Sequence, residues 1–420
     1  MPQGRELVIE LPQEVRPLPE PLPQGGRPGF KIRGTKGWAW TPEQYLEEIP
    51  VLARCKMNFL MNCYLSLFDD KTGKNEWWRP LPESKRRAFE EIVRSCQKHG
   101  VAFCFCMNPN LRSERFIGRD PREIDALWRH YRWMQSLGVK WFSVSLDDIQ
   151  RGIDAAMQAD VVNDILRRLR EKDPGAQMVF CPTFYWGDGT GDARTTAYNA
   201  ALARRLHPDI YVFWTGDEVV TPRITRRAAE SFKKILNHRV ILWDNYPVND
   251  GHPTMHLGPV VGRDADLGNV LDGYMVNPLC PQNRINRLPL LTCADYAYNP
   301  TAYDPARSIG QAIVHLAEND RQREALRHLT VAYPGMLIFG GGAGANPVRE
   351  RFLRIAAKAD SRAEAEKHLR DFDALVQRFA EAFPTQFPDA QKTLATDAAW
   401  LQEAFQKQYH DANHRGTEKP

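Results

Sequence analysis

Two adjacent carboxylates, Asp147 and Asp148, follow a short apolar stretch that has the composition of a buried strand. This stretch, residues 141–146, alternates apolar with small side chains. Two ionised groups side by side repel each other and are costly to desolvate, so stability alone seldom explains such a pair. Carboxylates in this position are equipped for acid–base chemistry. The structural alternative is a helix N-cap, because Asp148 precedes a helix expected to begin near Ile153.

A second polar cluster follows an apolar stretch at residues 239–243. It holds two acids and two amides, which are Asp244, Asn245, Asn249 and Asp250. Carboxylates and amides are the groups that hold the hydroxyls of a neutral, polyhydroxylated ligand. Capping of a turn would explain any one of these residues, but it does not readily explain all four.

The elements that must position these groups alternate between strands and helices from Phe30 to about residue 300. The pattern predicts strands near 30–34, 57–63, 101–106, 140–146, 177–182, 209–214, 239–243 and 272–276. It predicts helices near 42–55, 82–99, 121–137, 153–172, 193–206, 222–235, 264–271 and 284–296. Eight strand–helix units over roughly 270 residues match a (β/α)8 TIM barrel, which is the predicted α/β fold. A doubly wound open sheet is the alternative, because alternation alone does not show closure.

Polar and aromatic residues collect just after the predicted strands, and this favours the barrel. Barrel enzymes build their active sites at the carboxyl ends of the strands. The residues expected at this rim are Gly34, Asp147, Asp148, Tyr185, Thr215, Asn245, Asp250 and Asn277.

Composition sets the limits of the domain organisation. We expect a Pro-rich extended leader over 1–29, the barrel over 30–300, and a helical C-terminal region over 301–420 whose last residues, 414–420, fray.

The hydrophobic share is 43% and the net charge is +4, from 56 basic and 52 acidic residues. This near balance gives no case for nucleic acid or a membrane surface as a partner, and the oligomeric state stays open. No apolar run is long enough to span a membrane, and no signal peptide is visible, which leaves the compartment undetermined.

Several weaker signals have ordinary structural explanations. The eight cysteines form no CxxC pair, so buried free thiols are expected, with no metal and no cofactor. The glycine-rich stretch 340–344 lacks the residues of a phosphate-binding loop and is expected to join two helices. His252 and His256 have the spacing of a helical metal pair, but Pro253 argues against a helix. The acids at 69–70 fit a solvated turn. The tryptophans at 38, 40, 77 and 78 could stack on sugar rings or pack in the core.

Taken together, the motifs resemble those of glycoside hydrolase family 84, the β-N-acetylglucosaminidases that include the O-GlcNAcases. The matching segments run in the right order over about residues 30–300. They are SLDDI at 145–149, FCPTFY at 180–185, WTG at 214–216 with Val219, WDN at 243–245 with Asn249-Asp250, LGP at 257–259 with Gly262-Arg263, and Asn277-Pro278.

The resemblance implies a retaining exo-β-N-acetylhexosaminidase that removes terminal β-linked N-acetylglucosamine from a glycan or glycoconjugate. In substrate-assisted catalysis the acetamido carbonyl of the sugar attacks its own anomeric carbon and forms an oxazoline, so no enzyme nucleophile is needed. Asp147 would hold the acetamido N–H, Asp148 would serve as acid and then base, and Tyr185 would bond near the acetamido oxygen. The family pattern places Cys181, Thr215, Val219 and Trp243 around the acetamido group, and Asn245, Asp250 and Asn277 at ring hydroxyls and the glycosidic region.

The chain departs from the family pattern in its first two strand loops. After strand one the family carries Glu-Gly-Phe-Tyr-Gly, whereas residues 33–37 read RGTKG. After strand two it carries Pro-Lys-Asp-Asp, whose lysine binds a sugar hydroxyl, and residues 67–70 read LFDD instead. Either Lys36, two residues after Gly34, enters the pocket and substitutes for that lysine, or the 3- and 4-hydroxyls are recognised differently. The alternatives are a shifted specificity, for N-acetylgalactosamine or internal glycan cleavage, and a non-catalytic glycan-binding barrel.

Overall fold

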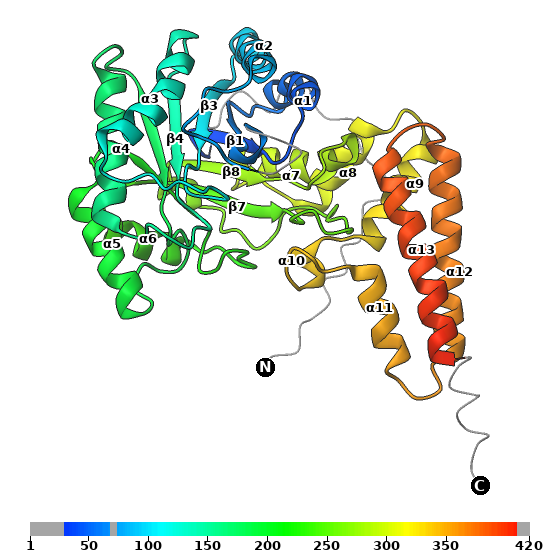
Figure 1. Ribbon diagram of the computed structural model, residues 1–420. Coiled ribbons are helices and arrows are strands. Elements are labelled where there is room, and N and C mark those ends of the chain that lie inside the picture. The colour runs from blue at the N-terminus through cyan, green and yellow to red at the C-terminus, as the bar shows by residue number, and fades with distance from the viewer. Residues whose placement is uncertain (1–28, 68–73, 410–420) are drawn as a thin grey trace.

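Eight parallel strands close into a barrel in sequence order, with β1 hydrogen-bonded to β8 (Figure 1). The computed structural model describes residues 29–67 and 74–409. The strands are β1 (Ile32–Gly37), β2 (Phe59–Asn62), β3 (Ala102–Met107), β4 (Trp141–Ser145), β5 (Gln177–Cys181), β6 (Tyr211–Trp214), β7 (Arg239–Pro247) and β8 (Gly273–Asn277). Their closure confirms the predicted TIM barrel and rules out the open sheet.

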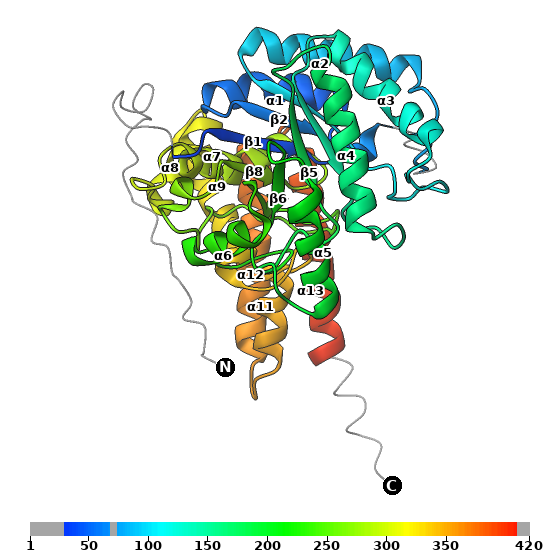
Figure 2. The ribbon, with the colours of Figure 1, turned by 90° about the vertical axis from the view of Figure 1, so that its left-hand side faces the viewer.

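Amphipathic helices cover the outside of the barrel and connect successive strands (Figure 2). They are α1 (Pro42–Arg54), α2 (Glu83–His99), α3 (Pro121–Ser136), α4 (Ala155–Arg170), α5 (Ala193–Arg205), α6 (Arg226–Leu236) and, after β8, α7 (Arg287–Tyr298). Side chains such as Thr41, Asp120 and Asp154 cap their N-termini by accepting backbone N–H bonds, which fixes where each helix begins. Short 3-10 turns lie at Tyr64–Ser66, Leu267–Asn269 and Arg284–Asn286.

One predicted helix is wrong. The segment 264–271 contains no α-helix and has only the 3-10 turn Leu267–Asn269. Gly268 lies so close to the segment before β1 that an added Cβ would come within 2.0 Å of the Gly29 carbonyl oxygen. This tertiary contact replaces the helix, so β7 is joined to β8 by a long loop.

The C-terminal region is helical, as predicted, and extends from one side of the barrel (Figure 1). Its helices are α8 (Pro305–Leu316), α9 (Asp320–Ala332), α10 (Met336–Phe339), α11 (Pro347–Ala356), α12 (Arg362–Ala382) and α13 (Pro388–Tyr409). The glycine-rich stretch at 340–344 joins α10 to α11, as expected. The apolar core of this region takes in Met255 and Leu257 from the β7–β8 loop, so the helices pack directly against a loop of the barrel rim.

All eight cysteines are free thiols, six of them buried. Among the described residues no helix is both long and apolar enough to cross a lipid bilayer. The predicted leader up to residue 28, the acids at 69–70 and the chain end from residue 410 lie outside the described residues.

Candidate active site

A cavity of about 220 Å³ opens at the carboxyl ends of the strands. The lining residues are Lys36, Trp38, Tyr64, Asp147, Asp148, Cys181, Tyr185, Val219, Val220, Trp243, Asn245, Val248, Asp250 and Asn277. The structure therefore brings together every predicted site residue except Gly34 and Thr215. These side chains come from β1, β5, β7, β8 and the loops after β1, β2, β4, β5, β6 and β7, which barrel closure places around one rim.

Asp147 is buried directly after β4, with 4% of its surface exposed. The Tyr64 hydroxyl donates to its Oδ2 at 2.6 Å, and the Asn108 amide donates to its Oδ1 at 3.1 Å. The same amide also donates to the Asp147 carbonyl oxygen at 3.0 Å. Donors to both carboxylate oxygens fix the orientation of the side chain and stabilise its ionised form.

Burial raises the pKa of Asp147 above its usual range, and three neighbours modify this rise. The positive charge of Lys36 opposes it, the negative charge of Asp148 adds to it, and the hydrogen bond from Tyr64 lowers the pKa again. The charge state of Asp147 therefore depends on Lys36 and Tyr64.

Asp148 differs from Asp147 in its exposure, its backbone conformation and its hydrogen-bond partner. It is exposed, and its backbone adopts the left-handed region with φ of 56°. The N-cap of α4 is Asp154, so the capping alternative for Asp148 does not hold. The Tyr185 hydroxyl donates to Asp148 Oδ1 at 3.0 Å. Burial raises the pKa of Tyr185, which keeps its hydroxyl protonated and able to donate.

Lys36 is 2% exposed, and its ammonium group lies among three aromatic rings. The distances from Nζ to the ring centroids are 4.7 Å for Trp38, 4.3 Å for Tyr64 and 4.4 Å for Trp243. Cation–π attraction stabilises the charge, but no described residue forms a hydrogen bond or ion pair with Nζ. The three N–H donors of this ammonium are thus available to a ligand in the cavity.

Polar side chains from β7, β8 and the β7–β8 loop form the side of the cavity opposite β4. Asn277 donates to Asn245 Oδ1 at 2.8 Å, and Asn245 donates to the Val219 carbonyl at 2.6 Å, so the two amides are fixed in one orientation. Asn277 Oδ1 is buried and has no partner in the described part of the chain. Asp250 lies at the rim, where partial desolvation raises its pKa.

Gly34 and Thr215 are placed outside the cavity lining. Gly34 lies inside β1 rather than after it, where an added Cβ would approach the Phe59 carbonyl oxygen of β2 to 1.9 Å. Thr215 directs its hydroxyl to the Glu218 carbonyl at 2.9 Å, and its N–H to the Tyr185 carbonyl at 3.0 Å. Both residues shape the backbone that carries the site.

Tyr64, Val220 and Val248 also line the cavity, and they are not among the predicted site residues. An aromatic residue two positions after β2 was the available signal for Tyr64. Its partner Asp147 is 83 residues away, a pairing that no local pattern contains. Trp38 was expected near the rim as either a sugar platform or a core residue, and it lies in the lining.

The described part of the chain holds no cluster of histidines and carboxylates suited to a metal. His256 bonds the Ala343 carbonyl at 2.9 Å, and both His252 and His256 lie in a loop. No group of three or more potential metal ligands occurs in residues 29–67 and 74–409.

A sequence profile described as β-N-acetylglucosaminidase matches residues 31–331. The chain belongs to this family. The match spans the whole barrel and confirms the resemblance seen in the motifs.

Similar proteins include two mammalian enzymes and one bacterial structure. The proteins named Protein O-GlcNAcase from Mus musculus and Rattus norvegicus are each 26% identical over 262 residues, which is 59% of this chain. The match spans only 28% of the length of those relatives. The structure of a point variant of the Thermobaculum terrenum O-GlcNAc hydrolase aligns with a TM-score of 0.73 at 23% identity, over 93% of this chain and 86% of that one, and shares its fold.

Proposed function

We propose that the protein is a retaining exo-β-N-acetylhexosaminidase that hydrolyses terminal β-linked N-acetylglucosamine by substrate assistance. The observation that carries this proposal is the division between adjacent aspartates: Asp147 is buried and fixed by two donors, and Asp148 is exposed. Substrate assistance needs one carboxylate to hold the acetamido group and another to exchange a proton with the leaving oxygen.

Asp147 serves as the acetamido acceptor in this mechanism. Its carboxylate receives the acetamido N–H and stabilises the positive charge that grows as the acetamido oxygen attacks the anomeric carbon. The bonds from Tyr64 and Asn108 hold the carboxylate in place before the substrate arrives. The buried site also strengthens the interaction, because water screens it little.

Asp148 serves as the acid and then the base. It protonates the departing glycosidic oxygen, and in the second step it takes a proton from the water that opens the oxazoline. Its exposed position gives the leaving group and the water access. Tyr185 donates to Asp148 and lines the same cavity, and in the proposed mechanism its hydroxyl bonds the acetamido oxygen.

Lys36 takes the part of the lysine that the family carries after strand two. Its ammonium group has free donors in the same cavity as both aspartates, and sugar hydroxyls are suitable acceptors. Trp38 and Trp243 border the same space and offer apolar faces to the sugar ring, while Asn245, Asn277 and Asp250 supply polar contacts. Cys181 and Val219 complete an uncharged part of the wall, since burial raises the pKa of the Cys181 thiol.

The acid role is tested with Asp148→Asn on two substrates. A general acid contributes about 10²–10⁴-fold to a step that needs protonation, so turnover of a glycoside with a poor leaving group should fall far more than that of an activated aryl glycoside. Asp217→Asn removes an exposed carboxylate outside the cavity and should leave both rates unchanged. Equal losses on both substrates would remove Asp148 from the acid role.

Substrate assistance is tested separately with a thiazoline analogue of the oxazoline. Strong competitive inhibition is expected, because the analogue reproduces the intermediate that the site stabilises. Indifference to the analogue in an active enzyme would contradict the mechanism. Binding of N-acetylglucosamine without turnover of any activated substrate would establish a glycan-binding barrel instead.

A shifted substrate specificity is the second candidate function. It is suggested by the position of Lys36, which lies on β1, whereas the lysine of the family pattern follows strand two. A lysine that enters from a different strand meets the sugar hydroxyls from a different direction. The ratio of kcat/KM for aryl N-acetylglucosaminide over aryl N-acetylgalactosaminide measures this directly. A ratio below one would assign the site to N-acetylgalactosamine.

A further inference from the structure

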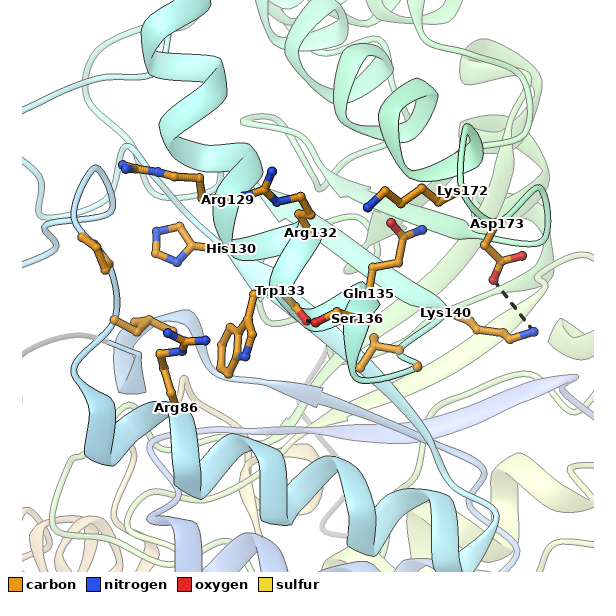
Figure 3. A pocket seen from close by; sticks show the side chains of 14 residues that line it. Arg86, Arg129, His130, Arg132, Trp133, Gln135, Ser136, Lys140, Lys172 and Asp173 are labelled. Atoms are coloured by element: carbon orange, nitrogen blue, oxygen red, sulfur yellow. Dashed lines mark hydrogen bonds and ion pairs between the residues drawn. The ribbon is translucent and has the colours of Figure 1, made fainter.

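A cavity of about 760 Å³ lies on the outside of the barrel between α2 and α3 (Figure 3). We call it the α2–α3 groove. Among the described residues it has no lining residue in common with the candidate active site. A volume of this size lies in the range of ligand-binding sites.

The groove is strongly cationic. Five of its lining side chains are basic, namely Arg86, Arg129, Arg132, Lys140 and Lys172, and Asp173 is the one acid among them. The excess of four positive charges equals the formal net charge of the whole chain, +4. His130 adds nothing at neutral pH, because burial lowers its pKa to about 4.

Much of this charge is not neutralised by the protein. Lys140 lies 3.8 Å from Asp173, and Arg129 donates to the Trp78 carbonyl at 2.9 Å. Within residues 29–67 and 74–409, the side chains of Arg132 and Lys172 form neither a hydrogen bond nor an ion pair. The guanidinium of Arg86 lies 5.0 Å from the Trp133 ring centroid. The close-up shows the two side chains beside each other (Figure 3). Ordinary solvated basic residues stand on convex helix faces, whereas these converge on a hollow.

The spacing of the cations indicates an elongated ligand. Arg129 and the end of α3 at Ser136 are seven residues apart, or roughly 10 Å along the helix, and Lys140 lies beyond that end. A single inorganic anion does not span this length. An extended peptide advances about 3.3 Å per residue and covers it in roughly three residues.

The floor of the groove is apolar. Leu81 and Val139 are buried in it, and a smaller cavity of about 220 Å³ continues from it at Gly138, Val139 and Lys140. Successive side chains of an extended peptide point to opposite sides, so acidic residues can meet the cationic walls while apolar ones enter the floor. Arginine pairs with carboxylates in a bidentate geometry, which adds specificity for an acidic chain.

We propose that the α2–α3 groove binds an extended acidic peptide segment of a partner protein, in which acidic and apolar residues alternate. This binding is separate from hydrolysis and does not rest on the proposed function. The contacts are charge-assisted hydrogen bonds to the basic side chains of the groove and apolar contacts at its floor.

The test uses the full chain and a fluorescein-labelled hexapeptide, Glu-Leu-Glu-Leu-Glu-Leu, with fluorescence anisotropy as the readout. Binding should weaken as salt rises from 0.1 M to 1 M, since the Debye length falls from about 10 to about 3 Å. The double variant Arg132→Glu with Lys172→Glu should weaken binding at least tenfold. The matched control, Arg227→Glu with Lys234→Glu, makes the same charge change on exposed positions of α6 and should bind within twofold of the parent protein.

Three results would overturn the proposal. They are the absence of measurable peptide binding, equal loss in the groove variant and the α6 control, and displacement of the peptide by ATP at lower concentration than by unlabelled peptide. The last would assign the groove to phosphate-bearing ligands. A circular dichroism spectrum and a Tm equal to those of the parent protein serve as the check that both double variants have folded.

Discussion

The hydroxyl of Tyr64 is expected to set both the rate and the pH dependence of the reaction. Tyr64→Phe removes the 2.6 Å bond to Asp147, and a hydrogen bond to a charged group contributes about 1.5–3 kcal/mol. We expect kcat to fall by roughly 10- to 100-fold with little change in KM. The lost bond normally lowers the pKa of Asp147, so its removal raises that pKa and the acidic limb of the kcat profile moves to higher pH.

A matched control variant separates this effect on Asp147 from a general loss of stability caused by removing a tyrosine hydroxyl. Tyr303→Phe deletes a hydroxyl that donates to the Val260 carbonyl at 2.8 Å, outside the cavity lining. It should leave the pH profile unchanged. An unshifted acidic limb in Tyr64→Phe, with the parent rate, would show that the bond to Asp147 has no part in catalysis.

Lys36→Met separates substrate binding from the charge of Asp147. The positive charge of Lys36 lowers the pKa of Asp147, so its loss should also move the acidic limb to higher pH. Unlike the loss of Tyr64, it removes the donors proposed for a sugar hydroxyl and should therefore raise KM as well. A pH shift at constant KM would restrict Lys36 to an electrostatic role. Lys31→Met, outside the cavity lining, is the control and should change neither.

Among individual residues, the sequence pattern predicted those that lie at strand ends, but it did not predict the side chains that hydrogen-bond to them. Asp147, Asp148, Asn245, Asp250 and Asn277 were found because strand periodicity and local polarity mark them. The bonds made by Tyr64 and Asn108 join loops from different strands, and such pairings follow from barrel closure rather than from local spacing.

Among the elements, the loop between β7 and β8 depends on a close approach to the C-terminal region. An added Cβ at Gly258 would lie 1.7 Å from the Pro334 carbonyl oxygen, and the neighbouring Leu257 N–H donates to the Tyr333 carbonyl at 3.0 Å. Gly258→Ala should destabilise the protein by about 1–3 kcal/mol or more and lower Tm by several degrees. Gly342→Ala, where no heavy atom lies within 4 Å of the added Cβ, is the control. Equal Tm values for the two variants would contradict the proposed contact.

The same loop shows why one element could not be predicted. Helical spacing over 264–271 is real, but Gly268 weakens a helix by about 1 kcal/mol relative to alanine, and its lack of a side chain admits the Gly29 carbonyl. Ile224 and Arg263 also form an isolated parallel bridge that draws the segment towards α6. These contacts join parts of the chain far apart in sequence, and they outweigh a weak local preference.

For the whole molecule, barrel closure was predictable because eight repeated units of suitable length leave few other arrangements. The packing of the C-terminal helices against the barrel rim was not predictable. Helical periodicity shows which face of a helix is apolar, but it does not show which part of the molecule that face contacts. In the structure, Met255 and Leu257 of the β7–β8 loop belong to the apolar core of those helices. The loop that carries Asp250 is therefore supported by helices that begin at Pro305 and lie further along the chain.

Because the C-terminal helices support this loop, we expect a substitution that destabilises the helices to lower the activity of the site as well. Asp397 of α13 is fully buried, and it accepts bonds from Tyr333 at 2.6 Å, Arg349 at 2.7 Å and Asn346 at 3.0 Å. Asp397→Ala leaves the buried Tyr333 hydroxyl and Asn346 amide without their acceptor and also removes the partner of the partly buried Arg349. Each buried polar group left without a partner costs about 1–3 kcal/mol. We expect a lower Tm by calorimetry and, on heating, loss of aryl-glycoside hydrolysis together with the helical signal.

The control is Asp371→Ala on α12, whose carboxylate is 62% exposed and pairs with Lys367 at 2.6 Å on the surface. Exposed pairs of this kind contribute about 0–1 kcal/mol, so Tm and activity should stay near those of the parent protein. If Asp397→Ala instead lost its helical C-terminal region to protease while the remaining barrel kept full activity, the helices would not support the rim. The apolar contacts of Met255 and Leu257 argue for the coupled outcome, because a loop cannot lose its packing partner and keep Asp250 fixed at the cavity.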